Sequence, residues 1–407
     1  PNLYKTKLEL LFDRPAAEPD RAPKGVIGIP RVLNMYEDYP FWHAFFTELG
    51  FRVILSPPSN KEMYEKGMDT ISSDTACYPA KLVHGHIKWL VENDIKRIFY
   101  PCINYEVKED STAPNHYNCP IVATYPEVID KNMAEYFCEN VAKHYKLDDT
   151  RIYKLFAMNF SRREISQAMH AGREAYREFK KNVQLEGRKA LKYMEEHELH
   201  GIVLTGRPYH LDPEVNHGID NVINQQGMVV LTEDSVSGMA EFPRPIRILD
   251  QWVYHSRLYK AAVFAGQRDN KLYTVLKIDE GSNLGSAKIR IRSLKAALEE
   301  RKKTGVHTRK VALPYQRKLF TKEMKDEGYT LLVPQMSPIH FQYFEAILKR
   351  SGYNAVLLPR VTQNAEEEGL RYINNDACYP TIVTLGQIIS ALKSGKYDLD
   401  KVGVFMS

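Results

Sequence analysis

Cysteines are the residues of this 407-residue chain whose positions most suggest chemistry. Cys77 precedes a predicted helix, where the positive end of the helix dipole favours the thiolate. Cys102 follows a predicted strand, at the carboxyl end of a sheet, where ligand sites of open α/β sheets form. The order of elements places both thiols on one rim, which suits a soft metal and above all an iron–sulfur cluster. Position alone leaves a ligand role and a role as a small buried apolar residue equally open.

The other three cysteines differ in their surroundings. Cys378 repeats the position of Cys77 and is a third candidate ligand. Cys119 precedes Pro120 at the start of a predicted strand, and Cys138 lies on a predicted helix, so both are interpreted as small buried residues. No Cys-x-x-Cys pair occurs, which disfavours a zinc ribbon or a thioredoxin-type site.

A polar loop follows the predicted strand 202–205. Arg207, Tyr209 and His210 are its candidate binding residues, with Asp212 and His217 close behind in the sequence. Such a rim can position an anionic group or tune a nearby cluster by hydrogen bonding. The alternative is a loop whose polar groups satisfy its own backbone.

Two segments about 300 residues apart resemble each other and predict the elements that position these residues. Gly50 matches Gly352 at an offset of 302, and the Cys-Tyr-Pro that begins at Cys77 matches the one at Cys378 at an offset of 301. Each copy alternates apolar strands with helices of apolar periodicity, which is typical of a parallel sheet covered on both faces. We therefore predict an α/β protein with two or three Rossmann- or flavodoxin-like parallel-sheet lobes and an internal duplication.

Four regions follow from this organisation. Residues 1–24 are expected to be a linker, because 13–24 are rich in proline and charge. Residues 25–150 form the first repeat lobe, and 151–310 a long helix, roughly 161–197, plus a middle α/β lobe. Residues 311–407 form the second repeat lobe, expected to be truncated because the chain stops after the apolar run 402–406.

Composition excludes several classes of protein. The net charge of +5 is only mildly basic, which argues against a nucleic-acid binder. No apolar run reaches the roughly 18 residues of a membrane span, and five scattered cysteines suggest the reducing cytoplasm. The chain has neither a P-loop nor a dinucleotide-binding fingerprint. Any ATP hydrolysis is therefore expected in a partner domain or subunit.

Several long motifs carry a resemblance to a known family. The segments IGIPRVLNMYEDYPFW, CYPAKLVHGHI, IFYPCINYE, HYNCPIVATYPEVI, TGRPYHLDPEVNHGI and NNDACYPTI resemble the activase-related region of the large fused proteins in the 2-hydroxyacyl-CoA dehydratase and double-cubane-cluster group. The resemblance covers the chain from about Lys24 to its end. In that group an ATP-hydrolysing activase passes low-potential electrons to a cysteine-bound iron–sulfur centre.

The resemblance implies a ligand set with one gap. Cys77 and Cys102 match the first-repeat cluster cysteines, and Cys378 matches the first cysteine of the second repeat. The family pattern has another cysteine in a glycine-rich segment after the helix that ends near Gln267, and this chain lacks that segment. The expected cofactor is a [4Fe-4S] or double-cubane cluster.

Three functions remain open at this point. The first is an iron–sulfur electron-transfer or reductase module fed by an ATP-dependent activase. The second is a docking or regulatory domain that has lost its cluster and binds an activase partner. The third is an acyl-CoA binding or dehydratase component with an acyl-CoA or other small-molecule substrate. Whether the chain is itself an enzyme stays open, and neither a nucleic acid nor a membrane is expected as a partner.

Overall fold

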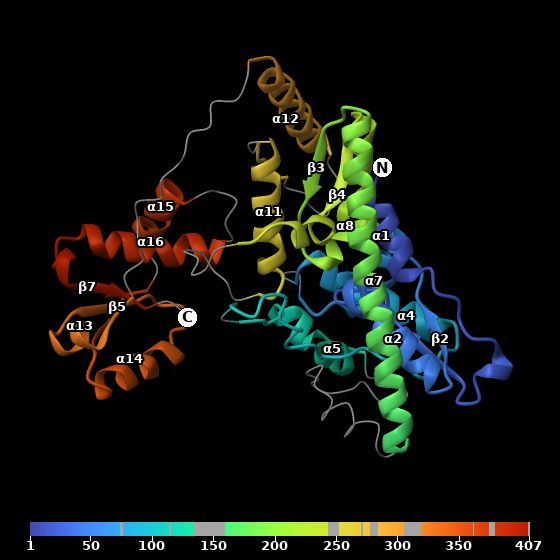
Figure 1. The fold of residues 1–407 in the computed structure, drawn as a ribbon. Helices are drawn as coiled ribbons and strands as arrows, with labels where there is room; N and C mark the ends of the chain where they lie inside the picture. The colour runs from blue at the N-terminus through green and yellow to red at the C-terminus, as the bar shows by residue number, and fades with distance from the viewer. Residues whose placement is uncertain are drawn as a thin grey trace. The chain divides into compact units, whose positions relative to one another are not determined.

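The computed structural model describes residues 1–73, 76–113, 115–133, 159–242, 252–269, 272–276, 284–304, 319–360, 362–373 and 379–405. The chain divides into two compact units, Pro1–Lys310 and Val311–Ser407. Both combine helices with small parallel sheets (Figure 1), which confirms the α/β class in its coarse form. The strands of the described residues form sheets of two or three, so the larger Rossmann-like lobes stay a prediction.

The first sheet pairs β1 (Val26–Ile29) with β2 (Arg52–Leu55) in parallel. Helix α2 (Met35–Glu48) connects them, and the chain turns back at Gly50, where φ is +86°. The predicted strand 97–100 forms a single parallel bridge instead, between Gly28 and Ile98. Cys102 lies four residues after Ile98 of this bridge.

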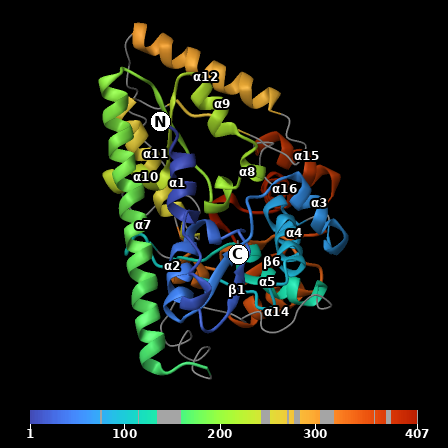
Figure 2. The ribbon, with the colours of Figure 1, turned by 90° about the vertical axis from the view of Figure 1, so that its right-hand side faces the viewer.

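Helix α7 (Arg162–Glu196) covers α2 and is the longest element of the described residues (Figure 2). It starts at a capping box made by Ser161 and Glu164, close to the predicted boundary. Gly172 lies where α7 meets Phe41, because a Cβ at position 172 would stand 2.8 Å from the Phe41 ring. The glycine that disfavours a helix by propensity is therefore what allows the two helices to approach.

Residues 1–24 are not simply a linker, contrary to the expectation. Residues Leu3–Phe12 form helix α1, capped by the Asn2 side chain, which accepts from the Tyr4 N–H. Leu3, Tyr4 and Leu11 are buried. The linker prediction rested on the proline-rich residues 13–24 and does not hold for the residues before them. Burial of apolar side chains holds α1 in place on the rest of the first unit.

A buried ionic cluster ties α2 to α7 and α11 (His255–Asp269). Arg257 donates to both carboxylate oxygens of Glu37, at 3.1 and 3.0 Å, and Lys180 also donates to Glu37. Burial opposes the charged form of Glu37, but Arg257, Lys180 and Lys7 outweigh it and lower its pKa well below the usual value.

The middle of the first unit holds a second parallel pair. Strand β3 (Gly201–Leu204) lies beside β4 (Val229–Thr232), with Gly201 opposite Val229. Between the two strands the chain forms short helices, which carry the polar loop of the sequence analysis. The remaining elements of this unit are η1 (Pro19–Arg21), α3 (Lys61–Gly67), η2 (Met68–Thr70), α4 (Tyr78–Glu92), α5 (Pro120–Asn132), η4 (Pro208–Leu211), α8 (Pro213–Asn216), α9 (Ile219–Gln225), α10 (Glu233–Val236), η5 (Ser237–Met239) and α12 (Gly285–Thr304).

The second unit contains a parallel sheet in the order β6-β5-β7. Its last strand lies within the apolar run 402–406 that the sequence predicted as a strand. No helix of the described residues in either unit is long and apolar enough to cross a bilayer. The elements are α13 (Lys322–Asp326), β5 (Thr330–Val333), α14 (His340–Arg350), β6 (Asn354–Leu357), α15 (Gln363–Tyr372), α16 (Tyr379–Lys393), η6 (Leu399–Lys401) and β7 (Val402–Val404).

Candidate functional site

Two cysteines occupy the same structural position in the first unit. Cys77 is the N-cap residue of α4 with φ −64° and ψ 151°, and Cys119 is the N-cap residue of α5 with φ −66° and ψ 155°. A proline stands in the first turn of each helix, where its missing N–H costs nothing. The predicted strand after Cys119 is wrong, because Pro120 starts a helix.

Tyr100 is a buried tyrosine whose electrostatic surroundings include three thiols. Its side chain is 3% exposed, and its hydroxyl group has no hydrogen-bond partner. Burial raises its pKa well above the usual value, and Cys102, Cys119 and Cys77 raise it further. Three thiols thus act electrostatically on one buried tyrosine, and we call Cys77, Cys102, Cys119 and Tyr100 together the thiol site.

The thiols of the site influence one another. Loss of water raises the pKa of Cys77, and the neighbouring Cys119 raises it further, while Arg207 and the backbone N–H of Ala80 lower it. The position of Cys77 at the start of a helix predicts that the helix dipole favours its thiolate. Desolvation outweighs that contribution here, although Cys77 keeps part of its surface exposed. Cys102 is fully buried.

The polar loop after β3 reaches the thiol site through two of its predicted residues. Arg207 Nη1 donates to the Tyr209 hydroxyl at 3.2 Å, and that hydroxyl lies 3.9 Å from Cys119 Sγ. Arg207 also stands over the ring of Trp252, 5.6 Å from its centroid. A cation and a phenol are thus held beside Cys119.

The other residues of the loop have different surroundings. His210 Nδ1 accepts from the Arg207 N–H at 3.2 Å, and the His210 ring lies against Gly206. Asp212 is buried, accepts from Tyr36 at 2.5 Å and from Ser59, and caps α8. His217 stacks on Tyr78. Asp212 and His217 thus join the loop to the first lobe, while His210 lies against the loop itself.

His84 and His86 of α4 do not share a site. His86 contacts the hydroxyls of Ser56 and Ser59, at 2.7 and 2.9 Å. His84 contacts the hydroxyls of Thr70 and Tyr125, at 2.8 and 3.0 Å. Both nitrogens of each ring are occupied within the core. This agrees with their positions two residues apart on a helix.

Two cysteines lie outside the described residues, namely Cys138 and Cys378. The prediction of Cys378 as a ligand therefore stays a prediction. Among the described residues, no three His, Cys, Asp or Glu side chains are grouped closely enough to hold one metal ion. Cysteines that bind a cluster attach to different irons and stand farther apart than the ligands of a single ion.

Cys119 and Tyr100 are the residues that sequence reasoning missed. The motif Asn118-Cys119-Pro120 places a proline directly after the cysteine, much as Cys77-Tyr78-Pro79 places one two residues later. This shared signal of a helix start would have predicted a common position for the two thiols. Tyr100 carries no comparable local signal.

Fold and site together define an α/β protein with two thiols at helix N-termini, Cys77 and Cys119, and a third, buried thiol at Cys102. Residues 26–236, just over half of the chain, match the family described as a CoA enzyme activase uncharacterised domain. The chain belongs to this family. That agrees with an activase-related region of the acyl-CoA dehydratase system. The comparisons with the curated proteins and with the solved structures gave no match.

Proposed function

We propose that the chain holds an iron–sulfur cluster at Cys77, Cys102 and Cys119 and carries electrons in the activation of an acyl-CoA dehydratase. Its electrons would come from an ATP-hydrolysing activase domain or subunit. The observation that carries the proposal is that Cys77 and Cys119 hold the same N-cap position on two helices and, with Cys102, act electrostatically on the buried, unpartnered hydroxyl of Tyr100. Membership of a CoA enzyme activase family supplies the physiological setting.

The residues of the thiol site suit this group chemically. Thiolates are the ligands that iron–sulfur clusters take. Cys77 and Cys119 begin helices, and the partial positive charge of helix N-termini stabilises an anionic centre. Arg207 adds a full positive charge on the same side. A bound cluster would supply the capacity to accept and release single electrons.

The chain's own residues would then orient and tune that centre. The Tyr209 hydroxyl, fixed by Arg207, can donate to the Cys119 sulfur, and a hydrogen bond to a ligand sulfur raises the reduction potential. Tyr100 offers a second hydroxyl inside the site. Its burial, and that of Cys102, keeps water away from that side of the site.

Cys378 remains a proposal on sequence grounds. Its match to Cys77 would make it a ligand of a second centre in the second unit. The two units would in that case be copies of one cluster-binding scaffold. The acyl-CoA compound itself, whether substrate or effector, would bind to the dehydratase partner or to this chain.

The test is anaerobic reconstitution of the full chain with iron and sulfide, followed by metal analysis and visible spectra. We expect bound iron and sulfide with broad absorption near 400 nm, on the order of what sulfur-to-iron charge transfer gives. Cys77→Ala and Cys119→Ala should each lose most of the iron, while Cys138→Ala serves as the matched control. Iron content equal to wild type in both variants would exclude the thiol site as the binding site.

A second candidate is the cluster-free docking domain. Its support is that the sequence lacks the cysteine-bearing, glycine-rich segment that the resemblance places after the helix ending near Gln267. If the wild-type chain stays colourless after reconstitution and still binds an activase domain in a pull-down, this second function replaces the first.

A further inference from the structure

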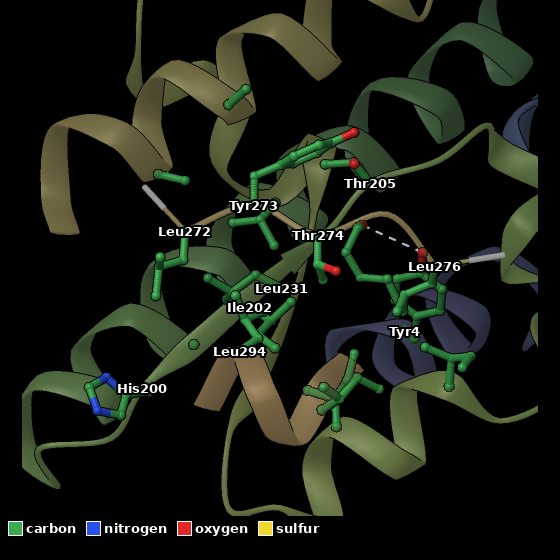
Figure 3. Close-up of a pocket in the computed structure, with 18 of the residues that line it drawn as sticks. Tyr4, His200, Ile202, Thr205, Leu231, Leu272, Tyr273, Thr274, Leu276 and Leu294 are labelled. Carbon is green, nitrogen blue, oxygen red and sulfur yellow. Dashed lines mark hydrogen bonds between the residues drawn. The ribbon is translucent and has the colours of Figure 1, made fainter. Parts of the chain in front are cut away.

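A cavity of about 500 Å³ lies along the open side of β3 in the first unit (Figure 3). Side chains of β3, α9, α11 and α12 line it, together with residues 272–276. Figure 3 shows Thr205 and Tyr273 at one end, His200 at the other, and Ile202, Leu231 and Leu294 between them. The volume is that of a pocket for one small molecule.

The lining of the cavity is mostly apolar, and the described residues that line it include no Lys, Arg, Asp or Glu. A phosphate, a carboxylate or an ammonium group would therefore find no partner of opposite charge among these residues, which disfavours its desolvation. A nucleotide or another phosphorylated compound does not suit such a lining. The middle of the cavity suits a hydrocarbon chain or a ring.

Polar groups are available at the end of the cavity formed by the loop after β3. Because the Arg207 N–H donates to His210 Nδ1, we assign the ring proton of neutral His210 to Nε2, where it can serve as a donor. Loss of surrounding water and the charge of Arg207 lower the pKa of His210 to about 4, although part of the ring lies at the surface. At neutral pH His210 is thus uncharged, and Thr205 adds a hydroxyl.

The same loop forms part of the thiol site. Arg207 and Tyr209 face Cys119, whereas Thr205 and His210 line the cavity. In this loop Thr205 and His210 stand before and after Arg207 and Tyr209, so one pair of residues serves each side. A molecule in the cavity would lie next to the loop that contacts the thiols.

We propose that this cavity binds an uncharged small molecule with an apolar body and one carbonyl or hydroxyl oxygen, which is held by Thr205 and His210. The cavity supplies the area for the apolar body, and the loop supplies donors for a single acceptor. The site does not depend on the cluster, since none of the three thiols lines the cavity. Failure of the proposed function would thus leave this binding site intact.

The test uses a matched pair of probes, 2-octanone and octanoate, and isothermal titration of the full chain at pH 7.5. We expect 2-octanone to bind at least about tenfold more tightly than octanoate, because no described lining residue carries a positive charge that would offset the cost of desolvating the carboxylate. Leu294→Trp fills the cavity from α12 and should abolish binding of the ketone. Leu185→Trp, at an exposed position of α7, is the control and should bind as wild type does.

Two further variants separate the alternatives. His210→Phe should weaken ketone binding, since it removes the donor and keeps the ring. Cys119→Ala should bind the ketone as wild type does, whatever its iron content. No binding of 2-octanone by wild type, equal affinity for octanoate, or full binding by a Leu294→Trp chain with an unchanged melting temperature would each overturn the proposal.

Discussion

Helices α2 and α14 connect the first two parallel strands of their sheets, but they differ in what covers them. In α2, Trp42 and Phe45 are 1% and 0% exposed, and α7 packs over the helix. In α14, the residues at the offset of 302 are Phe344 and Ile347, which are 45% and 58% exposed. The same strand-helix-strand arrangement therefore has a buried apolar helix face in the first unit and an exposed one in the second.

A shared contact shows how similar the two arrangements are. A Cβ at Gly85 of α4 would lie 1.7 Å from the Met63 carbonyl oxygen, and a Cβ at Gly386 of α16 would lie 1.8 Å from that of Ala365. In both units the later helix touches the backbone of the earlier one at a glycine. This similarity supports a duplication, which remains a proposal.

The ionic cluster of the first unit has no counterpart at the matching positions. Ile339 stands where Glu37 stands, and His340 where Asp38 stands. Ile339 is 68% exposed, whereas Glu37 is buried against Arg257. The charge of Glu37 on α2 is thus paired with cations of α7 and α11. In the described part of the second unit, α14 instead exposes apolar side chains.

The largest expected effect comes from truncating a buried side chain of α2, the helix that α7 covers. Trp42→Ala should lower the free energy of unfolding of the first unit by about 3–5 kcal/mol, because it leaves a large cavity. Phe344→Ala is the matched substitution in the second unit and should change stability by no more than about 0.5 kcal/mol. Denaturant titration followed by peptide-resolved hydrogen exchange distinguishes the units. A similar loss in both would refute the contrast.

A smaller effect, equal in the two units, is expected at the glycine contacts. Gly85→Ala and Gly386→Ala should each destabilise their own unit by about 1–3 kcal/mol, since a methyl group would meet a backbone oxygen. Gly238→Ala, whose Cβ would meet nothing closer than 3.4 Å, is the control. If only one of the two glycines tolerated alanine in thermal unfolding, the two helix pairs would not be equivalent.

The third expected effect is a pH dependence of the stability of the first unit. Glu106 is buried beside Asp38, accepts from Asn34 and Asn118, and has its pKa raised by burial from 4.5 to about 7. Burial and Glu106 also raise the pKa of Asp38. Because the folded chain retains protons that the unfolded chain releases, stability should fall as pH rises from 4.5 to 7.

Glu106→Gln tests this dependence, since an amide of the same shape removes the titration. The variant should show a flatter free energy of unfolding across this pH window than wild type. Glu65→Gln, at an exposed position of α3, is the control and should keep the wild-type slope. An unchanged slope in Glu106→Gln would assign the dependence to other groups.

Local patterns in the sequence determined much of the fold. The apolar periodicity predicted the helix 161–197 to within about a residue at each end, and the strand 202–205 was predicted to within one residue at each end. These features act over one or two turns of chain, so neighbouring residues suffice to specify them. Cys77 was correctly placed at the start of a helix for the same reason.

Only the tertiary structure decided which residues meet. Cys77, Cys102 and Cys119 act electrostatically on Tyr100, and the Tyr209 hydroxyl lies 3.9 Å from the sulfur of Cys119, ninety residues earlier in the chain. Gly172 became necessary because Phe41 packs against it, and residues 3–12 were drawn into the core by burial of their apolar side chains. Such contacts depend on how distant segments are packed together, which no local spacing in the chain encodes.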